Sequence, residues 1–220
     1  MVDRKRVVVI GGAGFLGKKI TEVLCLRGYE VTVFDAMPKK SPSDFEYICG
    51  DICCPEQLTP LIKRCDVVYH LAALADLETG KVDPLKVIYT NVMASANIAH
   101  VCAKFAVRLM FASSVYVYSS YGGFYRVSKQ SVENIIEQYS RDFSLDYTLL
   151  RYGSLYGSGA QVWNGLRKTV NEVLSNDDFM MRGDGSDRRE FIHVSDAAEL
   201  SVDALSGDYS RKAVNITGME

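Results

Sequence analysis

The sequence predicts an α/β protein built on a doubly wound parallel sheet. Two observations support this prediction. Apolar runs of strand length alternate with helix-length stretches along most of the chain, and the first run, Val7 to Ile10, leads directly into glycines at regular spacing. With 220 residues and 48% apolar side chains, the chain is long enough to bury a full core. We therefore expect one sheet with helices on both faces.

The elements follow in order along the chain. The expected strands lie at 7–10, 29–34, 66–71, 108–113, 146–151 and 213–216. Helices are expected between most of them, for example at 16–27, 92–105 and 126–142. In such sheets ligands collect beyond the carboxyl ends of the strands, so site residues should follow strands.

The βα rhythm weakens over residues 153–190, which begin with the glycine-rich segment 153–159. This stretch is interpreted as a substrate-side insertion. The chain is accordingly divided into a sheet core at 1–152 and a small substrate-binding lobe at 153–220, from which a strand near 213–216 returns to the core.

The glycines after the first strand form a phosphate-binding turn. Gly11 permits a tight turn, Gly14 has no Cβ to block a pyrophosphate, and Gly17 lets the following helix pack close to the strand. Phe15 and Leu16 open that helix, whose N-terminus faces the phosphates. The motif predicts a bound dinucleotide.

Asp35 follows the second strand, where a ribose-binding carboxylate is expected. A carboxylate accepts hydrogen bonds from the ribose hydroxyls and repels a 2′-phosphate, so NAD is favoured over NADP.

Composition limits the partners. Twenty-five basic residues against 27 acidic ones leave the chain nearly neutral, which argues against nucleic acid, and there is no apolar stretch long enough to cross a membrane. The N-terminus has no signal-peptide pattern, so a cytoplasmic location is expected. None of the six cysteines forms a C-x-x-C pair, which favours reduced thiols and no metal site.

Three residues suggest acid–base chemistry. Ser114 ends the fourth expected strand, and Tyr125 and Lys129 lie one helical turn apart on the next helix. A neighbouring ammonium favours the phenolate form of a tyrosine, and Ser114 can hydrogen-bond the same substrate oxygen for hydride transfer. The sequence therefore predicts that Tyr125 gives and takes a proton.

With these residues in place, the chain resembles the nucleotide-sugar epimerase/dehydratase family of the extended short-chain dehydrogenase/reductase superfamily, which is typified by the UDP-galactose 4-epimerases. The resemblance runs from residue 6 to about 218. It rests on GGAGFLG at 11–17, Asp35, Gly50-Asp51-Ile52, His70-Leu71-Ala72-Ala73, Asn91-Val92, the strand-end serine, YRVSK with Glu133, Leu150-Arg151-Tyr152 and the segment 188–194.

The resemblance implies a Rossmann fold and further contacts. Asp51 and Ile52 would bracket the adenine, and Lys129 would also hold the nicotinamide ribose. The remaining implied cofactor residues are Leu71, Ala72, Ala73 and Asn91, and the implied substrate residues are Ser114, Asn164 and Arg189. A guanidinium also suits phosphate oxygens on chemical grounds. His70 is implied to be a structural neighbour of the cofactor.

The resemblance further implies NAD-dependent epimerisation of a nucleotide sugar through a transient keto-sugar. Val115 and Tyr116 replace an acidic pair that related dehydratases carry, which disfavours dehydration and decarboxylation. Relatives have a longer loop before the tyrosine and continue beyond Glu220, so the substrate lobe is expected to be truncated. Alternatives are a one-way nucleotide-sugar reductase or dehydrogenase and a non-catalytic NAD-binding sensor or scaffold.

A homodimer is also expected from the resemblance, because the family pairs two long helices across a twofold axis. Here these helices are 92–105 and 126–142, with Ile98, Val132 and Ile136 as candidate interface residues. The competing interpretation is that these three side chains pack only on their own sheet.

Overall fold

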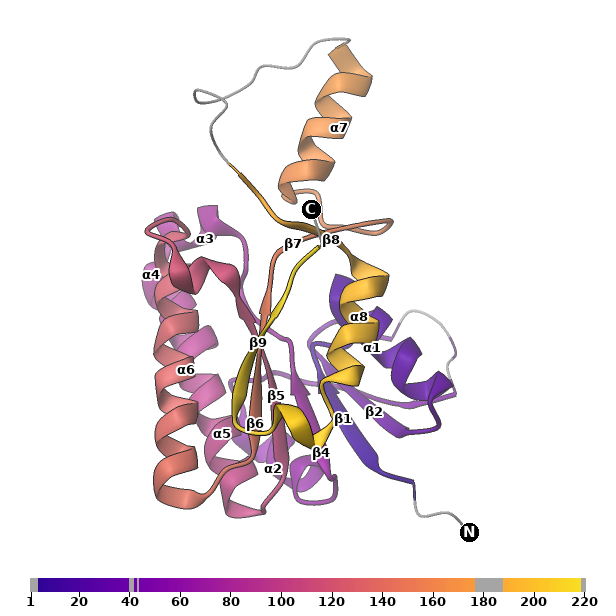
Figure 1. Cartoon of the computed structure of the whole chain (residues 1–220), viewed down its shortest axis with the longest axis vertical. Coiled ribbons are helices and arrows are strands. Elements are labelled where there is room, and N and C mark those ends of the chain that lie inside the picture. Colours follow the sequence, from indigo (N-terminus) through magenta and orange to yellow (C-terminus); the bar gives the residue numbers. More distant parts are fainter. Residues whose placement is uncertain (1–3, 40–41, 43, 177–187, 219–220) are drawn as a thin grey trace.

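The computed structural model describes residues 4–39, 42, 44–176 and 188–218. Its centre is a parallel sheet of seven strands in the order β3-β2-β1-β4-β5-β6-β9 (Figure 1). The strands are β1 (Arg6–Ile10), β2 (Glu30–Asp35), β3 (Glu46–Cys49), β4 (Val67–His70), β5 (Arg108–Ser114), β6 (Tyr147–Tyr152) and β9 (Lys212–Ile216). The strand order reverses between β1 and β4, which is where doubly wound sheets bind ligands. The predicted fold class is confirmed.

Helices cover both faces of the sheet. The side chains of β1 alternate, so that Val7 and Val9 face one core cluster while Val8 and Ile10 face the other. The first cluster includes residues of α1 (Phe15–Leu26) and α8 (Val194–Asp203). The second includes residues of α2 (Pro55–Ile62), α5 (Ala94–Lys104) and α6 (Gly123–Phe143). Burial on both sides explains the uninterrupted apolar runs of the inner strands.

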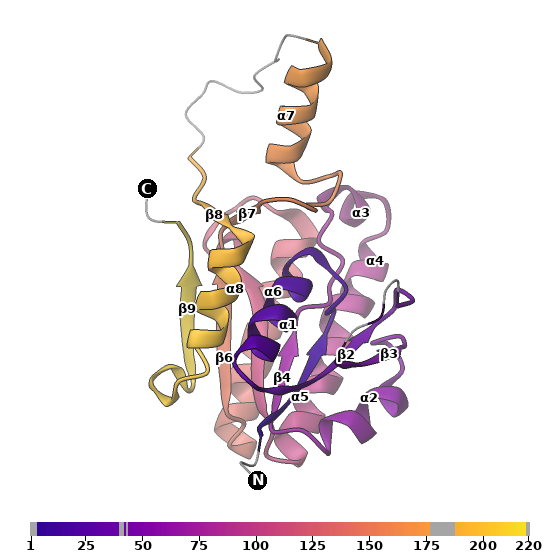
Figure 2. The same ribbon diagram turned by 90° about the vertical axis from the view of Figure 1, so that its right-hand side faces the viewer.

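Smaller elements gather at the carboxyl end of the sheet. Strands β7 (Ser154–Tyr156) and β8 (Phe191–His193) form a parallel pair of their own. Helix α7 (Gly165–Asn176) stands beyond them, apart from the helical layers (Figures 1 and 2). On the other side of that end, α3 (Leu77–Val82) and α4 (Pro84–Val87) lead into a π-helical segment, Ile88–Met93, that continues into α5.

The six expected strands are present to within two residues at each end. The elements not predicted individually include β3, α2 and α8. Strand β3 is a four-residue edge strand, and α2 contains Pro55 and Pro60, so neither carries a long periodic signal. The helix expected at 92–105 starts as a π-helical segment, which is a wider turn than periodicity reveals.

The segment 153–220 contributes to two parts of the structure, the main sheet assembly and the elements beyond its carboxyl end. Strand β9 pairs with β6, and α8 packs against α1, so both belong to the main sheet assembly. Residues 154–176, with β7 and α7, lie beyond the carboxyl end of the sheet (Figure 2). The division into a sheet core at 1–152 and a substrate-binding lobe at 153–220 therefore stays a prediction.

The candidate dimer residues were wrongly assigned. Ile98, Val132 and Ile136 are each 1% exposed or less and belong to the core cluster under α5 and α6. They pack on their own sheet because the apolar stripe of each helix faces inward. Within the described ranges, no helix has the length and apolar character needed to cross a membrane.

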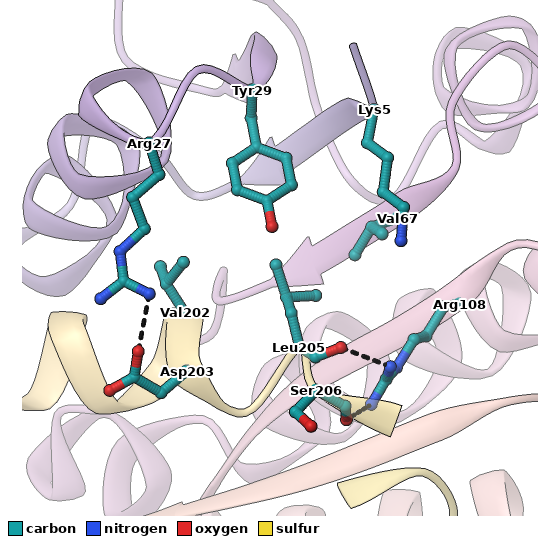
Figure 3. Close-up of a pocket in the computed structure, with 9 residues that line it drawn as sticks. All are labelled: Lys5, Arg27, Tyr29, Val67, Arg108, Val202, Asp203, Leu205 and Ser206. Atoms are coloured by element: carbon teal, nitrogen blue, oxygen red, sulfur yellow. Dashed lines mark hydrogen bonds and ion pairs between the residues drawn. The ribbon is translucent and has the colours of Figure 1, made fainter. Parts of the chain in front are cut away.

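A cavity of about 340 Å³ lies at the amino ends of the strands (Figure 3). Its lining includes Arg27 and Arg108, and both guanidinium groups bind α8 or the loop after it. Arg27 forms an ion pair with Asp203 at 2.6 Å and another with Glu199. Arg108 donates to the carbonyl oxygens of Leu205 at 2.8 Å and Ser206 at 3.2 Å. The Arg27 contacts fasten α8 to the end of α1, and the Arg108 contacts fasten the loop after α8 to β5.

Candidate functional site

The glycine turn between β1 and α1 has the close contacts that its sequence predicts. Gly11 has a φ of +88°, and a Cβ there would lie 2.6 Å from the backbone nitrogen of Ala72. A Cβ on Gly17 would lie 2.1 Å from the carbonyl oxygen of Gly11. Gly14 differs, since the nearest atom to its hypothetical Cβ is 3.2 Å away. Packing therefore requires Gly11 and Gly17, whereas Gly14 keeps an open surface for a ligand.

The first turn of α1 supplies hydrogen-bond donors to that surface. The backbone N–H groups of Phe15, Leu16 and Gly17 have no acceptor within a regular helix. Among the described residues, no side chain caps this end, and no acidic residue lies in the first turn. An N-terminus of this kind binds phosphate through its N–H groups and the helix dipole.

Asp35, the last residue of β2, lies beside the same turn. Its Oδ2 accepts from the N–H of Ala13 at 2.9 Å and its Oδ1 from the N–H of Met37 at 2.9 Å. A carboxylate offers about four acceptor sites, so both oxygens keep capacity for ribose hydroxyls. The turn and Asp35 together fit the pyrophosphate and ribose of a dinucleotide.

The other predicted cofactor residues surround this turn. Leu71 and Ala72 follow β4, and both backbone N–H groups donate to the carbonyl oxygen of Ile10, at 2.8 and 3.0 Å. Ala73 is half-buried in the same loop. After β3, Asp51 is exposed and accepts from the N–H of Cys53 at 2.9 Å, while Ile52 is half-buried against the core. All of them follow strand ends, as the topology requires.

Asn91 holds the loop after β4 in place. Its Oδ1 accepts from the N–H of Leu74 at 2.8 Å, and its Nδ2 donates to the carbonyl oxygen of Leu74 at 3.0 Å and to Ser128 Oγ at 3.1 Å. These bonds connect the π-helical segment, the loop and α6. Its direct contact with a cofactor stays a prediction, because its amide group is already bonded within the chain.

Ser114 and Tyr125 meet at the carboxyl end of β5. Their side chains lie close enough to interact, although the connecting loop is short. Burial and the neighbouring Tyr116 raise the pKa of Tyr125 to about 12, and the Ser114 hydroxyl opposes this rise. The phenol therefore holds its proton at neutral pH in this state.

Lys129 lies one turn further along α6. Its Nζ donates to the carbonyl oxygen of Ala112 at 2.6 Å and lies 4.7 Å from the ring centre of Phe111 and 5.6 Å from that of Tyr125. Burial lowers the pKa of Lys129 to about 7, although Glu133 opposes this shift. Its ammonium charge beside the phenol is thus weaker than the spacing alone suggests.

His70 is a structural residue, as the resemblance implied. Its Nε2 is 2.7 Å from Ser95 Oγ, which itself donates to the carbonyl oxygen of Asn91 at 2.5 Å. Burial, together with the charge of Lys129, lowers the pKa of His70 to about 3, so the ring is neutral at physiological pH. It ties β4 to the start of α5.

Sequence reasoning missed a buried polar network behind Ser114. Ser113 Oγ donates to Glu133 at 2.5 Å, and Glu133 pairs with Arg151 at 2.6 Å. Arg151 donates to the hydroxyl of Tyr118 at 2.5 Å, and that hydroxyl donates to Asn215 Oδ1 at 3.1 Å. The network fixes the turn after β5 to α6, β6 and β9. No local pattern in the sequence signals it, because Glu133 and Arg151 are 18 residues apart.

The two predicted substrate residues differ in their surroundings. Asn164 precedes α7, where its Oδ1 accepts from the N–H of Arg167 at 3.1 Å and its Nδ2 donates to the carbonyl oxygen of Leu155 at 2.9 Å. Arg189 is exposed, and its Nη1 donates to the hydroxyl of Tyr116 at 3.3 Å, beside Tyr125. Arg189 therefore contacts the turn after β5, whereas Asn164 caps α7.

Metal ligands were not expected. In the parts of the chain that the structure describes, no group of three or more His, Cys, Asp or Glu side chains is arranged to hold a metal ion.

Comparison with known proteins identifies one family profile, the NAD dependent epimerase/dehydratase family, which matches residues 7–217. Among curated proteins, the chain is 29% identical to UDP-N-acetyl-alpha-D-glucosaminuronate decarboxylase of Bacillus cytotoxicus, over 97% of this chain and 75% of the relative. It is 28% identical to a putative UDP-glucose 4-epimerase of Methanocaldococcus jannaschii, over 97% and 77%. It spans 56% of UDP-glucuronic acid decarboxylase 1 of Danio rerio, at 26% identity over 94% of this chain.

Comparison with solved structures also finds nucleotide-sugar enzymes that bind NAD. MoeE5 in complex with UDP-glucose and NAD superposes with a TM-score of 0.87 at 26% identity, covering 98% of this chain and 77% of that one. The UDP-glucose 4-epimerase of Thermus thermophilus in complex with NAD superposes with a TM-score of 0.84 at 26% identity, covering 98% and 78%. The relatives thus include both epimerases and decarboxylases.

Proposed function

The chain belongs to the NAD dependent epimerase/dehydratase family, and on this premise we propose that it epimerises a nucleotide sugar through a transient keto-sugar, with NAD as cofactor. The observation that carries the proposal is that Ser114, Tyr125 and Lys129 come together at the carboxyl edge of the sheet, the same edge at which the glycine turn and Asp35 lie. A proton carrier and a dinucleotide cradle on the same sheet edge suit reversible oxidation of an alcohol.

Each residue has a distinct role in this proposal. Ser114 hydrogen-bonds the reacting sugar hydroxyl, and Tyr125 removes its proton and later returns it. Bound NAD would take up the hydride and give it back, and the positive charge of its oxidised ring favours the phenolate of Tyr125. Lys129, whose Nζ lies 5.6 Å from the centre of the Tyr125 ring, would hold the nicotinamide ribose. Arg189 binds the substrate diphosphate, for which a guanidinium is well suited.

Epimerisation is proposed over decarboxylation because of the turn after β5. Val115 and Tyr116 occupy the positions directly after Ser114, so this turn carries no carboxylate between Ser114 and Tyr118. Relatives named as decarboxylases are nevertheless similar over most of the chain. Loss of carbon dioxide from a UDP-uronic acid is therefore the outcome that would replace this proposal.

The test is incubation of the purified protein with NAD and a panel of UDP-, GDP-, CDP- and dTDP-sugars, including UDP-uronic acids. We expect a sugar of inverted configuration without net accumulation of NADH. Net NADH would indicate a one-way dehydrogenase. In a parallel incubation with NADH in place of NAD, consumption of NADH would indicate a reductase. Tight NAD binding without turnover of any sugar would favour a sensor or scaffold.

We also propose that the protein forms a homodimer, through the solvent side of the α5 and α6 layer. Apolar side chains are exposed there, among them Met93 at 50%, Val127 at 37% and Phe143 at 64%. Burial of such a surface favours association. Sedimentation equilibrium should give a mass that rises with concentration toward twice the chain mass, and Val127→Lys should shift it toward the monomer. A mass of one chain at all concentrations would contradict the dimer.

A further inference from the structure

Tyr116 contacts three residues of the candidate site, Ser114, Tyr125 and Arg189. It lies in the 3₁₀ turn Val115–Tyr118 that follows β5, and its backbone N–H donates to Ser114 Oγ at 3.2 Å. Because the oxygen of Ser114 accepts this bond, the hydroxyl hydrogen of Ser114 is directed elsewhere, which leaves it available to Tyr125. The backbone of Tyr116 thus orients the serine.

The ring of Tyr116 packs against the helix that carries Tyr125. The two ring centres are 6.4 Å apart and the rings are nearly perpendicular, at 89°. This edge-to-face arrangement is favourable for aromatic pairs. The same ring lies over Gly122, which has a φ of +98° and where a Cβ would come within 3.2 Å of ring atoms. The start of α6 is therefore shaped to receive this ring.

The hydroxyl of Tyr116 points toward a different segment. It accepts a hydrogen bond from Nη1 of Arg189 at 3.3 Å. Arg189 lies just before β8. A phenol accepts this bond while staying neutral, so the guanidinium keeps its full charge for an anion. A carboxylate in the same place would form an ion pair with Arg189 and compete with a phosphate.

We propose that Tyr116 is a positioning residue that holds Tyr125 with its ring and Arg189 with its hydroxyl, so that a diphosphate on Arg189 and the sugar hydroxyl at Tyr125 are set at a fixed separation. The part of this inference that concerns a diphosphate rests on the proposed function. The part that concerns Tyr125 rests on the ring contact alone.

Two variants separate these roles, and Tyr121→Phe is the matched control, because Tyr121 lies in the same loop with 74% of its surface exposed. Tyr116→Phe removes the hydroxyl and keeps the ring. We expect about a three- to tenfold weaker affinity for UDP, measured by calorimetry with NAD present, and a matching rise in KM with kcat within about twofold, as for loss of one hydrogen bond. The control should match the parent.

Tyr116→Leu removes the ring as well. We expect kcat to fall about ten- to a hundredfold, because a small misplacement of a catalytic group costs about that much. The acidic limb of the pH profile, which reports loss of the Tyr125 proton, should move to lower pH, since Tyr116 helps to raise the pKa of Tyr125. Thermal melting must show that both variants fold. If Tyr116→Leu does not fold, Tyr116→Phe still tests the role of the hydroxyl.

A readout without turnover distinguishes failure of this inference from failure of the proposed function. The titration of Tyr125 is isolated as the ultraviolet difference between the protein and its Tyr125→Phe variant, in the parent and in the Tyr116 variants. A pKa of Tyr125 that differs between Tyr116→Leu and Tyr116→Phe supports the ring contact even if no sugar is turned over, because both variants lack the hydroxyl and only Tyr116→Leu lacks the ring. An unchanged pKa together with unchanged UDP affinity in Tyr116→Phe would overturn the proposal and leave Tyr116 as a packing residue.

Discussion

At the amino end of the central sheet Arg27 and Arg108 face a cavity, and at the carboxyl end Ser114 and Tyr125 face each other beside the glycine turn. Both ends are polar, but their hydrogen-bonding groups are used differently. The two arginines bind carboxylates and carbonyl oxygens that hold α8 in place. At the other end, Asp35 keeps free acceptor capacity and α1 presents uncapped N–H groups.

The comparison shows that neither charge nor a cavity is enough to identify a functional site. A guanidinium whose donors are bonded to the fold has little left to offer a ligand, whereas donors and acceptors at strand ends with remaining capacity can bind one. If this distinction is right, substitutions at the amino end should change stability and those at the carboxyl end should change binding and turnover.

The largest effect is expected at Tyr125. Tyr125→Phe keeps the ring and removes the proton carrier, so turnover of the nucleotide sugar should fall by about a hundred- to ten-thousandfold. Calorimetry should give nearly unchanged NAD affinity. Lys129→Met should reduce both turnover and NAD affinity if it holds the ribose. Parent-like turnover by Tyr125→Phe would mean that another group transfers the proton.

Arg108→Leu tests the amino end. Loss of the guanidinium leaves the carbonyl oxygens of Leu205 and Ser206 without their donor, and unfolding in urea should report about 2–4 kcal/mol less stability. Lys5→Ala is the control, since this exposed residue lines the same cavity and should change stability by less than about 0.5 kcal/mol. The NAD affinity of both folded variants should equal that of the parent. Weaker NAD binding by Arg108→Leu would contradict the claim that the amino end of the sheet serves stability alone.

Gly14→Ala tests the carboxyl end without a large steric conflict in the fold. A Cβ there meets only Gly11 at 3.2 Å, so the protein should fold, while the methyl group projects into the pyrophosphate position. We expect at least about tenfold weaker NAD binding, equivalent to 1.4 kcal/mol. Gly165→Ala on α7, where a Cβ meets no atom within 4 Å, should bind NAD as the parent does.

The smallest effect concerns cofactor choice. The parent should bind NAD more tightly than NADP, because the 2′-phosphate would meet the carboxylate of Asp35. Asp35→Asn should narrow the ratio of the two dissociation constants, and its amide oxygen can keep one of the two hydrogen bonds, from Ala13 or from Met37. Equal affinity of the parent for both cofactors, measured by titration calorimetry, would contradict this role.

Much of the fold was predictable because burial on both faces leaves long apolar runs in the inner strands. Edge strand β3 and the proline-containing α2 lack such a signal. Ser114, Tyr125 and Lys129 could be predicted because helix periodicity and strand-end topology place them together. The lowered pKa of Lys129 could not be predicted, because it depends on burial in the assembled site.

Contacts across the chain were the least predictable. Tyr116 and Arg189 are 73 residues apart, and their hydrogen bond depends on the path of the chain into β8. A pattern can also be visible while its partner is not, as at Ile98, Val132 and Ile136. Their apolar stripe was visible, but sequence alone did not decide whether it faced the sheet or a second subunit.

The bond between Tyr118 and Asn215 has a consequence for the order of events on the ribosome. The two residues are 97 positions apart, so the turn that carries Ser114 is fastened by a strand that is synthesised long after it. Strands β1, β2 and β4, which form the nucleotide half of the sheet, are complete before residue 71. Because pairing of distant segments forms late, the turn that carries Ser114 reaches its final position only after β9 has joined the sheet beside β6.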